Sequence, residues 1–207
     1  MKLFEREFPD LPAIGKPEWQ EARVTATVTR EQIAEINTKW GVDAIAMLES
    51  AIHNESYQQL CRLISKVIFT PRPEEIKWQK TALWLKDLLE KKKGKNKFVL
   101  TNGGVGTALE YIDDFELEPL KNKTVLNNFG SFYKIGKIFD TDVYVDPNMR
   151  WDNNELAIVS GNILEFKEDS GANVVEEATF QPRVITTIKY KLYHPDSDVY
   201  KINDFQI

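Results

Sequence analysis

The sequence has little cysteine, little histidine and no long apolar run. Its 207 residues include one cysteine, Cys61, and two histidines, His53 and His194. A single cysteine forms no disulfide within the chain, and it fits a reducing compartment. The two histidines are far apart, and neither has the second helical histidine that a zinc-protease motif needs. Because no run of about 18 apolar residues is present, no transmembrane helix is expected.

Basic charge is also scarce. Lysine and arginine number 27 against 32 aspartates and glutamates, which leaves a net charge of -5. An acidic chain has no general attraction to nucleic acid. The segment Met1–Glu7 is charged where a signal peptide carries an apolar region, so no secretory leader is expected. The hydrophobic content of 42% predicts a globular protein, in one large domain or two small ones.

The first 28 residues predict an extended hairpin. Residues 22–28 alternate small apolar and polar side chains with many β-branched residues, which is typical of a strand, and residues 2–8 alternate in part. A two-stranded ribbon by itself is marginal in water. We therefore expect the hairpin to lean on another element, such as a neighbouring subunit.

Helices are predicted next. Thr29 and Gln32 match a capping box at the start of one helix, and Asp43 is placed to cap a second. In the second helix apolar residues repeat at helical spacing from Ile45 to Ile68. Residues 74–93 predict a third helix with apolar positions at Ile76, Leu83, Trp84, Leu88 and Leu89.

A basic turn follows the third predicted helix. It runs from Lys91 to Lys97 and holds five lysines. Lysine is favoured near the negative end of a helix dipole, so we expect this turn to be a solvated helix end.

A glycine-rich turn lies between a predicted strand and a predicted helix. The apolar run Lys97–Leu100 predicts the strand, and residues 103–112 predict the helix. Phosphate can bind where a helix begins, but Gly103–Gly106 fits neither the dinucleotide fingerprint nor the Walker pattern. The alternative is a tight turn that needs the conformational freedom of glycine.

The remaining chain predicts strands. They are expected at 132–139, 142–147, 155–160 and 199–202, with a loop or tip from Asp113 to Phe129. The longest alternation lies near the C-terminus, where one face carries Val184, Thr186, Ile188, Tyr190 and Leu192. Such alternation predicts a half-buried strand.

The residues do not predict a catalytic, metal or cofactor site. Asp140, Asp142 and Asp146 lack the spacing and central glycine of a calcium loop, and turn chemistry explains most of them. Cys61 lies on an apolar helix face and is expected to be a small core residue.

Several segments, taken in order, resemble major capsid proteins of tailed bacteriophages with the Hong Kong 97 fold, in particular the T-even myovirus branch. They are Arg23–Ala26, Glu31–Ile36, the long helix that follows Gly41–Ala44, Phe98–Ile112, Gly136–Pro147, Ala178–Pro182 and Thr186–Tyr193. The resemblance implies an α+β fold with an extended β-hairpin loop, a long spine helix with a sheet, and a mixed α/β axial domain.

The same resemblance implies a domain organisation. Residues 1–28 would form the extended loop (E-loop), residues 29–72 and 178–207 the peripheral domain, and residues 73–177 the axial domain. The segment ahead of Arg23 is shorter than is usual in the family, which puts locking by an N-terminal arm in doubt.

The resemblance also implies a function. The chain would be a non-enzymatic subunit that assembles with itself, through pentamers and hexamers, into an icosahedral shell in the virion, built in the host cytoplasm. Expected partners are scaffold, portal or other head proteins and packaged DNA held without sequence specificity, but no membrane and no cofactor. Subunit contacts are expected at Phe4, Phe8, Trp19, Arg23, Val24, Asp113 and Phe115.

Two alternatives stay open. A cellular nanocompartment shell of the encapsulin type would share the fold and enclose enzymes. A small α/β enzyme would instead use Gly103–Gly106 as a nucleotide site.

Overall fold

The chain forms two compact units. The computed structural model describes residues 4–9, 17–118, 131–150, 153–176 and 182–204. The first unit comprises residues 1–60 and 164–192, and the second comprises residues 61–163 and 193–207. Helix α2, Ala44–Ile68, contributes residues to both units.

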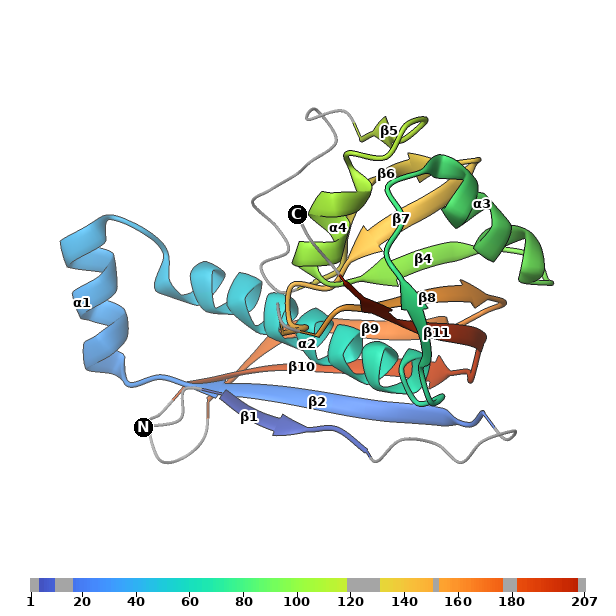
Figure 1. Ribbon diagram of the computed structural model, residues 1–207. Helices are drawn as coiled ribbons and strands as arrows, with labels where there is room; N and C mark the ends of the chain where they lie inside the picture. The colour runs from blue at the N-terminus through green and yellow to red at the C-terminus, as the bar shows by residue number, and fades with distance from the viewer. Residues whose placement is uncertain (1–3, 10–16, 119–130, 151–152, 177–181, 205–207) are drawn as a thin grey trace. The chain divides into compact units, whose positions relative to one another are not determined.

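The first unit contains a four-stranded antiparallel sheet in the order β1-β2-β10-β9 (Figure 1). Its strands are β1 (Phe4–Glu7), β2 (Trp19–Thr27), β9 (Leu164–Glu176) and β10 (Pro182–Leu192). The predicted hairpin is confirmed as the β1–β2 pair. The support that we expected for it comes from this chain, because β2 pairs along its whole length with β10.

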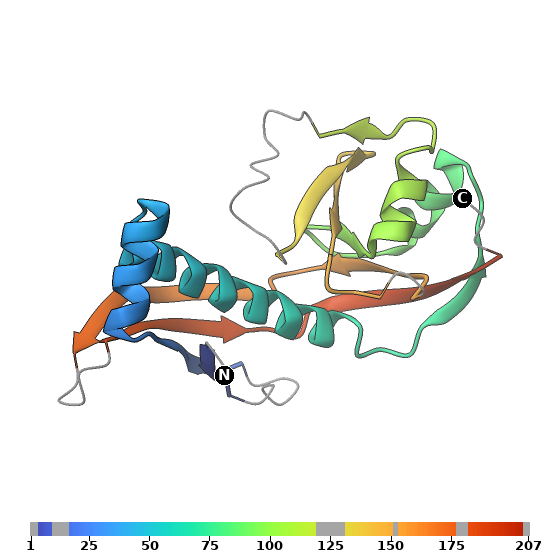
Figure 2. The same cartoon turned by 90° about the vertical axis from the view of Figure 1, so that its left-hand side faces the viewer.

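Helix α2 lies along one face of this sheet, as Figures 1 and 2 both show. The buried residues between them include Val24, Ala26 and Val184 from the sheet and Leu48 and Ile52 from the helix. In β10 every second residue is buried, in the phase that the sequence predicts. The opposite face of β2 and β10 carries the exposed and half-buried residues of the alternation.

Two capping arrangements define the helices of the first unit. Helix α1, Arg30–Trp40, begins with the predicted capping box of Thr29 and Gln32. It ends at Gly41, whose φ of 64° is the left-handed conformation favoured by glycine. Asp43 accepts hydrogen bonds from the amides of the first residues of α2, as expected.

The second unit contains a seven-stranded mixed sheet in the order β3-β11-β8-β4-β7-β6-β5. Pairs β3–β11 and β4–β7 are parallel, and the other pairs are antiparallel. The strands are β3 (Glu74–Lys77), β4 (Phe98–Thr101), β5 (Glu116–Leu117), β6 (Tyr133–Ile138), β7 (Thr141–Val145), β8 (Glu155–Ser160) and β11 (Asp196–Asn203).

Two short helices cover one face of the seven-stranded sheet. They are α3 (Ala82–Lys91) and α4 (Gly103–Leu109). Leu85 and Leu109 from the helices belong to the same core as Val99, Val143 and Ile158 from the strands. This cluster of buried apolar residues joins the helices to the sheet, and hydrophobic burial of this kind is the main stabilising term in folding.

One expectation is wrong, and one strand was missed. Residues 74–77 form strand β3 and not the start of the third helix, because they pair in parallel with β11. The helix begins only at Ala82, where the Thr81 side chain caps it. Strand β9 was not expected at all. It pairs antiparallel with β10, which assigns residues 164–176 to the first unit.

The two units do not have the bounds of the expected domains. The first unit ends at Leu60 within α2, and residues 193–207 belong to the second unit together with β11. Part of the expected tip (119–129) and most of Ala178–Pro182 lie outside the described residues.

Candidate functional site

Three of the predicted contact residues belong to the core of the first unit or pack against it. Val24 is 1% exposed and points toward α2. Phe4 and Phe8 are half-buried and pack against the same cluster. The neighbouring Arg6 side chain forms an ion pair with Glu55 on α2, with Nε and Oε1 2.6 Å apart. These side chains therefore hold β1 and β2 onto their own helix.

Trp19 and Arg23 lie on the other face of β2 and are exposed. Trp19 is 44% exposed, and the ammonium groups of Lys167 and Lys191 lie 5.6 and 6.0 Å from its ring centroid. Cation–π contacts at these distances help to hold an exposed aromatic ring in place. Arg23 lies between Glu7 of β1 and Thr187 of β10 in the strand register.

The last two predicted contact residues lie in the link between α4 and β5. Asp113 is exposed. Phe115 is half-buried and packs against the core of the second unit. A Cβ added at Gly136 would lie 2.4 Å from its ring, so the glycine leaves the space that Phe115 fills. Of this pair, only Asp113 presents its side chain to solvent.

The glycine-rich turn opens α4, as the sequence predicts. Asn102 is fully buried and caps the helix, with its Oδ1 accepting from the amide of Val105 at 2.9 Å. Its Nδ2 donates to the carbonyl oxygens of Arg150 and Asn153. Gly106 lies where a Cβ would approach Val145 Cγ2 to 2.6 Å. The turn thus has a packing role in which α4 lies close against β7.

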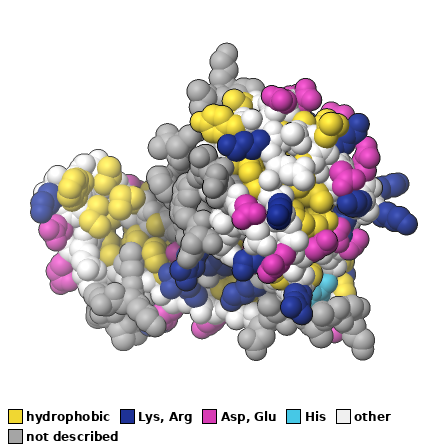
Figure 3. All heavy atoms as spheres, viewed as in Figure 1, with side chains coloured by type: hydrophobic (Ala, Val, Ile, Leu, Met, Phe, Trp, Pro, Cys, Tyr) yellow, Lys and Arg dark blue, Asp and Glu magenta, His cyan; other side chains and the backbone are white. Residues whose placement is uncertain are grey.

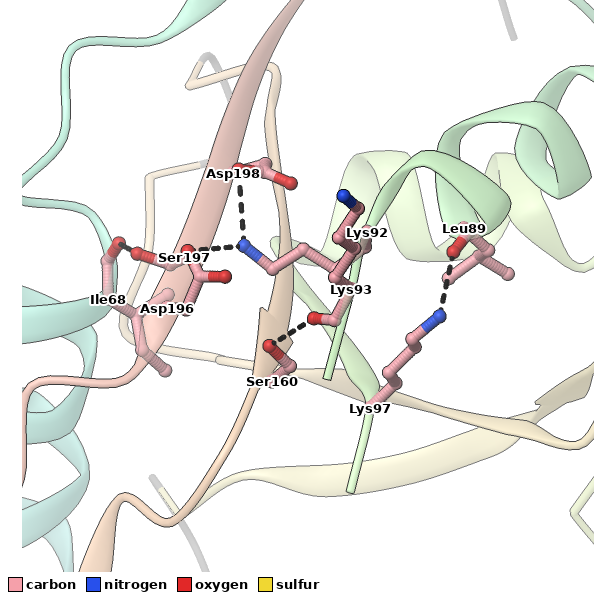
Figure 4. A network of polar contacts seen from close by, with 9 residues as sticks. All are labelled: Ile68, Leu89, Lys92, Lys93, Lys97, Ser160, Asp196, Ser197 and Asp198. Atoms are coloured by element: carbon pink, nitrogen blue, oxygen red, sulfur yellow. Dashed lines mark hydrogen bonds and ion pairs between the residues drawn. The ribbon is translucent and has the colours of Figure 1, made fainter. Parts of the chain in front are cut away.

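The basic turn after α3 is not uniformly solvated, in contrast to the expectation. The Lys92 side chain is 2% exposed, and its Nζ lies 2.8 Å from Asp196 Oδ1 and 3.1 Å from Asp198 Oδ1 (Figure 4). Lys97 Nζ donates to the Leu89 carbonyl at the end of α3. Lys93 is exposed. Two lysines of this turn therefore hold the link between α3 and β4.

A serine completes this polar cluster. Ser160 Oγ donates to the Lys93 carbonyl at 2.9 Å, and Gly94 has a φ of 113°, at which a side chain would collide with Ser160. Figure 4 shows Lys92 and Lys93, from the turn after α3, beside Ser160 of β8 and the aspartates of β11. The cluster is a structural joint in which the Lys92 ammonium is paired with two carboxylates and Ser160 donates to the Lys93 carbonyl.

Cys61 and Asp146 lie near one another in the second unit, where burial and hydrogen bonds keep both side chains unreactive. Burial raises the pKa of the Cys61 thiol, which keeps it protonated at neutral pH. Asp146 is 1% exposed and accepts from the hydroxyl of Ser65 and from the amide of Asn148. Through these hydrogen bonds the Asp146 carboxylate links Ser65 on α2 to the residues that follow β7.

The described residues include no group of three or more histidine, cysteine, aspartate or glutamate side chains that could hold a metal ion. None of the helices in the described part of the chain is both long and apolar enough to span a bilayer.

The most exposed apolar surface of the first unit was not expected. Trp40 is 71% exposed, Val42 44% and Met47 53%. Figure 3 shows apolar side chains gathered over α1 and the start of α2. Of these residues, the sequence places only Trp40 on an apolar helix face, together with Ile33 and Ile36, and periodicity does not tell whether such a face is covered within the chain.

Comparison with solved structures identifies the fold of this chain, whereas comparison of sequences finds no relative. No protein-family model matches the chain, and a search of curated proteins finds no match either. Among solved structures, a chain from Gordonia phage Cozz has a TM-score of 0.55 at 10% identity, over 98% of this chain and 81% of that chain.

Two further solved structures are less similar. A chain from Mycobacterium phage Che8 has a TM-score of 0.47 at 11% identity, over 89% of this chain and 70% of that chain. A chain from the asymmetric unit of the mature capsid of bacteriophage PhiM1 has a TM-score of 0.40 at 7% identity, over 98% and 82%. The fold assignment therefore depends on the Gordonia phage chain, with which this chain shares a mixed α/β fold.

Proposed function

We propose that this chain is a structural subunit of a bacteriophage capsid and has no catalytic role. The structural support is the likeness in fold to the Gordonia phage chain, because it extends over 98% of this chain and so includes both units. The capsid role itself comes from the resemblance of the sequence segments to major capsid proteins. Fold alone does not fix function, so the proposal needs a direct test.

The finer proposal is a Hong Kong 97-type subunit of the T-even myovirus branch. The β1–β2 hairpin would be the E-loop, and α2, with its 25 residues, would be the spine helix. The mixed sheet with α3 and α4 would form the axial domain. The peripheral domain would combine α2 with β10, at bounds that differ from the sequence-based ones in the placement of β9.

Assembly would proceed through many weak contacts between identical copies. Subunits would meet as pentamers and hexamers and close into an icosahedral shell around DNA that is held without base-specific contacts. Repetition of modest interfaces under closed symmetry gives a stable container. Among the predicted contact residues, Trp19, Arg23 and Asp113 are the exposed ones and therefore the best candidates.

The experiment is to purify the chain and to measure its mass by light scattering during size exclusion, with negative-stain microscopy of each peak. Rings of five or six copies, or closed shells, are expected. A monomer at every protein and salt concentration, also after addition of the other head proteins of its source, would contradict the proposal. Shells that contain protein cargo instead of DNA would point to a cellular compartment.

A further inference from the structure

The second half of α2 and the turn after it carry basic charge that no acidic residue of the same segment balances. Residues 56–73 contain Arg62, Lys66 and Arg72 and no aspartate or glutamate, although acidic residues outnumber basic ones in the whole chain. All three side chains are exposed, and all three belong to the second unit. Figure 3 shows Lys and Arg side chains grouped over α2. We call Arg62, Lys66 and Arg72 the basic face.

The other helices balance their lysines in a way that α2 does not. Three lysines of α1 and α3 each have an acidic partner four residues away: Lys39–Glu35, Lys86–Glu90 and Lys91–Asp87. At the same spacing Arg62 has Gln58 and Lys66 as neighbours. Among the described residues, no ion pair involves a side chain of the basic face. Like charges four residues apart are unfavourable in a helix, so folding does not account for the Arg62–Lys66 pair.

Arg62 and Lys66 lie on the solvent side of α2. Four residues of a helix rise by about 6 Å and return to the same side, so the two cations follow one another along the axis. Ile64, between them in sequence, is on the opposite side and is buried. Gln58 and Thr70 extend the row with polar side chains, and the Thr70 hydroxyl donates to the Lys66 carbonyl at 2.7 Å. A basic stripe along a helix is the electrostatic pattern of a nucleic-acid contact.

The helix dipole explains only part of this pattern. Lys66 lies in the last turn of α2, where a cation is favoured by the negative end of the dipole. Arg62 lies six residues before the end of the helix at Ile68, where the dipole effect has faded. The arginine guanidinium has a planar set of donors that matches two oxygens of one phosphate. Arg62 therefore distinguishes a phosphate contact from an ordinary helix end.

We propose that the basic face binds the phosphate backbone of nucleic acid without reading its bases. The face consists of exposed cations with polar neighbours, whereas a protein partner needs an apolar centre that excludes water. The net charge of -5 does not prevent the contact, since salt screens charges beyond about 10 Å at 0.1 M. The inference rests on the proposed function for the source of the nucleic acid, which would be the DNA inside a shell, and it names the surface that holds this DNA.

Salt-dependent binding tests the contact. The full chain is titrated into a short fluorescein-labelled DNA duplex, and fluorescence anisotropy gives the association constant at several salt concentrations. Three phosphate contacts predict a slope of about -2.7 for the logarithm of this constant against the logarithm of salt concentration. Arg62→Gln and Lys66→Gln should each weaken binding about fivefold and reduce the size of the slope by about 1. A duplex of unrelated sequence should bind equally well, because phosphates carry no sequence information.

Lys39→Gln is the matched control. It changes the net charge by the same amount on another helix, where the lysine has an acidic partner, so the association constant and the slope should stay as in the parent. Because Arg62 and Lys66 are exposed, their variants should keep the thermal midpoint of the parent. No binding at low salt, or an equal loss in Lys39→Gln, would overturn the proposal. Polyglutamate that binds as tightly as the duplex would also overturn it and assign the face to an acidic protein segment.

The two proposals fail separately. Duplex binding that depends on Arg62 and Lys66, in a chain that forms neither rings nor shells, would support the nucleic-acid contact and contradict the capsid role. Rings or shells from a chain without measurable duplex binding would overturn the contact and leave the capsid role standing. Both measurements use the same purified chain.

Discussion

At the scale of single residues, Tyr190 shows how a buried hydroxyl without a hydrogen-bond partner affects the stability of the first unit. Its side chain is fully buried in β10, and its hydroxyl has no hydrogen-bond partner among the described residues. A buried polar group without a partner loses its hydration and gains nothing in return. We expect Tyr190→Phe to leave the free energy of unfolding at pH 7 unchanged or to raise it by about 1 kcal/mol, measured by urea denaturation.

The same residue gives an alkaline prediction. Burial raises the pKa of Tyr190 to about 12, above the ordinary value of 10. Between these values the unfolded chain loses the proton while the folded chain keeps it, so stability falls as the pH rises. Tyr190→Phe should reduce this alkaline loss in urea titrations at pH 9 to 11.5. Part of the alkaline loss of stability should remain in this variant, because the pKa of Tyr200 is also raised to about 12. An identical loss in parent and variant would contradict this assignment.

Lys92 is a second buried polar residue. Its contribution to the free energy of unfolding depends on whether the lysine or its aspartate partners are replaced. Its buried ammonium faces the carboxylates of Asp196 and Asp198, whose side chains are 71% and 42% exposed. Removing one partner of a buried ion pair is harmful mainly when a charge stays buried alone. Lys92→Met keeps the aliphatic packing and frees two carboxylates that reach water, so we expect a small change in the free energy of unfolding.

The matched variant Asp196→Asn with Asp198→Asn leaves the Lys92 ammonium buried without a counter-charge. It should therefore destabilise the chain more than Lys92→Met does, by about 2 kcal/mol or more at pH 7. Chemical denaturation of both variants measures the difference. Equal destabilisation would mean that packing of the lysine stem, and not its charge, holds the joint.

At the scale of elements, the contact of α4 with β7 depends on a missing side chain. A Cβ at Gly106 would lie 2.6 Å from Val145 Cγ2, far inside contact distance. Gly106→Ala should lower the free energy of unfolding by about 1 to 3 kcal/mol, as overpacking does. Val145→Ala removes the colliding methyl group, so Gly106→Ala should be less harmful in that background. Additive losses in thermal or urea unfolding would contradict this explanation.

The elements that the sequence predicts well are those with local signals. The capping box of Thr29 and Gln32, the cap at Asp43 and the alternation in β10 all depend on residues close together in the chain. They need no information about distant partners. For the same reason the long helix α2 was expected close to its observed bounds.

The elements that the sequence misses are defined by pairing. Strand β3 has only four residues and exists through its parallel register with β11, more than a hundred residues away. Strand β9 carries charges and a glycine without clear alternation, and it is a strand because β10 offers an edge along most of its length. Strand propensity is too dependent on neighbours for either to be predicted locally.

The candidate surfaces were predictable to a lesser degree. Sequence reasoning selected Trp19 and Val24 alike, but the register of β2 sends them to opposite faces of the sheet. A shift by one residue exchanges the faces, and the sequence gives no absolute face without the partner strand. The exposure of Trp40 likewise depends on whether other elements cover α1, which is a tertiary property.

At the scale of the whole molecule, the proposed function demands surfaces that serve assembly and not folding. Exposed and buried contact candidates on the same strand allow these roles to be separated. Trp19 is 44% exposed, whereas Val24, five residues further along β2, is 1% exposed. If β2 contributes to contacts between copies, substitution on its exposed face should change association without changing folding.

We therefore expect Trp19→Ala to keep the thermal midpoint of the parent within a few degrees while it reduces the yield of rings or shells at fixed protein concentration. Val24→Ala should lower the free energy of unfolding by about 1 to 3 kcal/mol through the lost core contact. Calorimetry and light scattering on both variants measure the two effects. Full assembly by Trp19→Ala chains would remove this face of β2 from the contact, and the interfaces would then have to be sought at other exposed side chains such as Asp113 and Trp40.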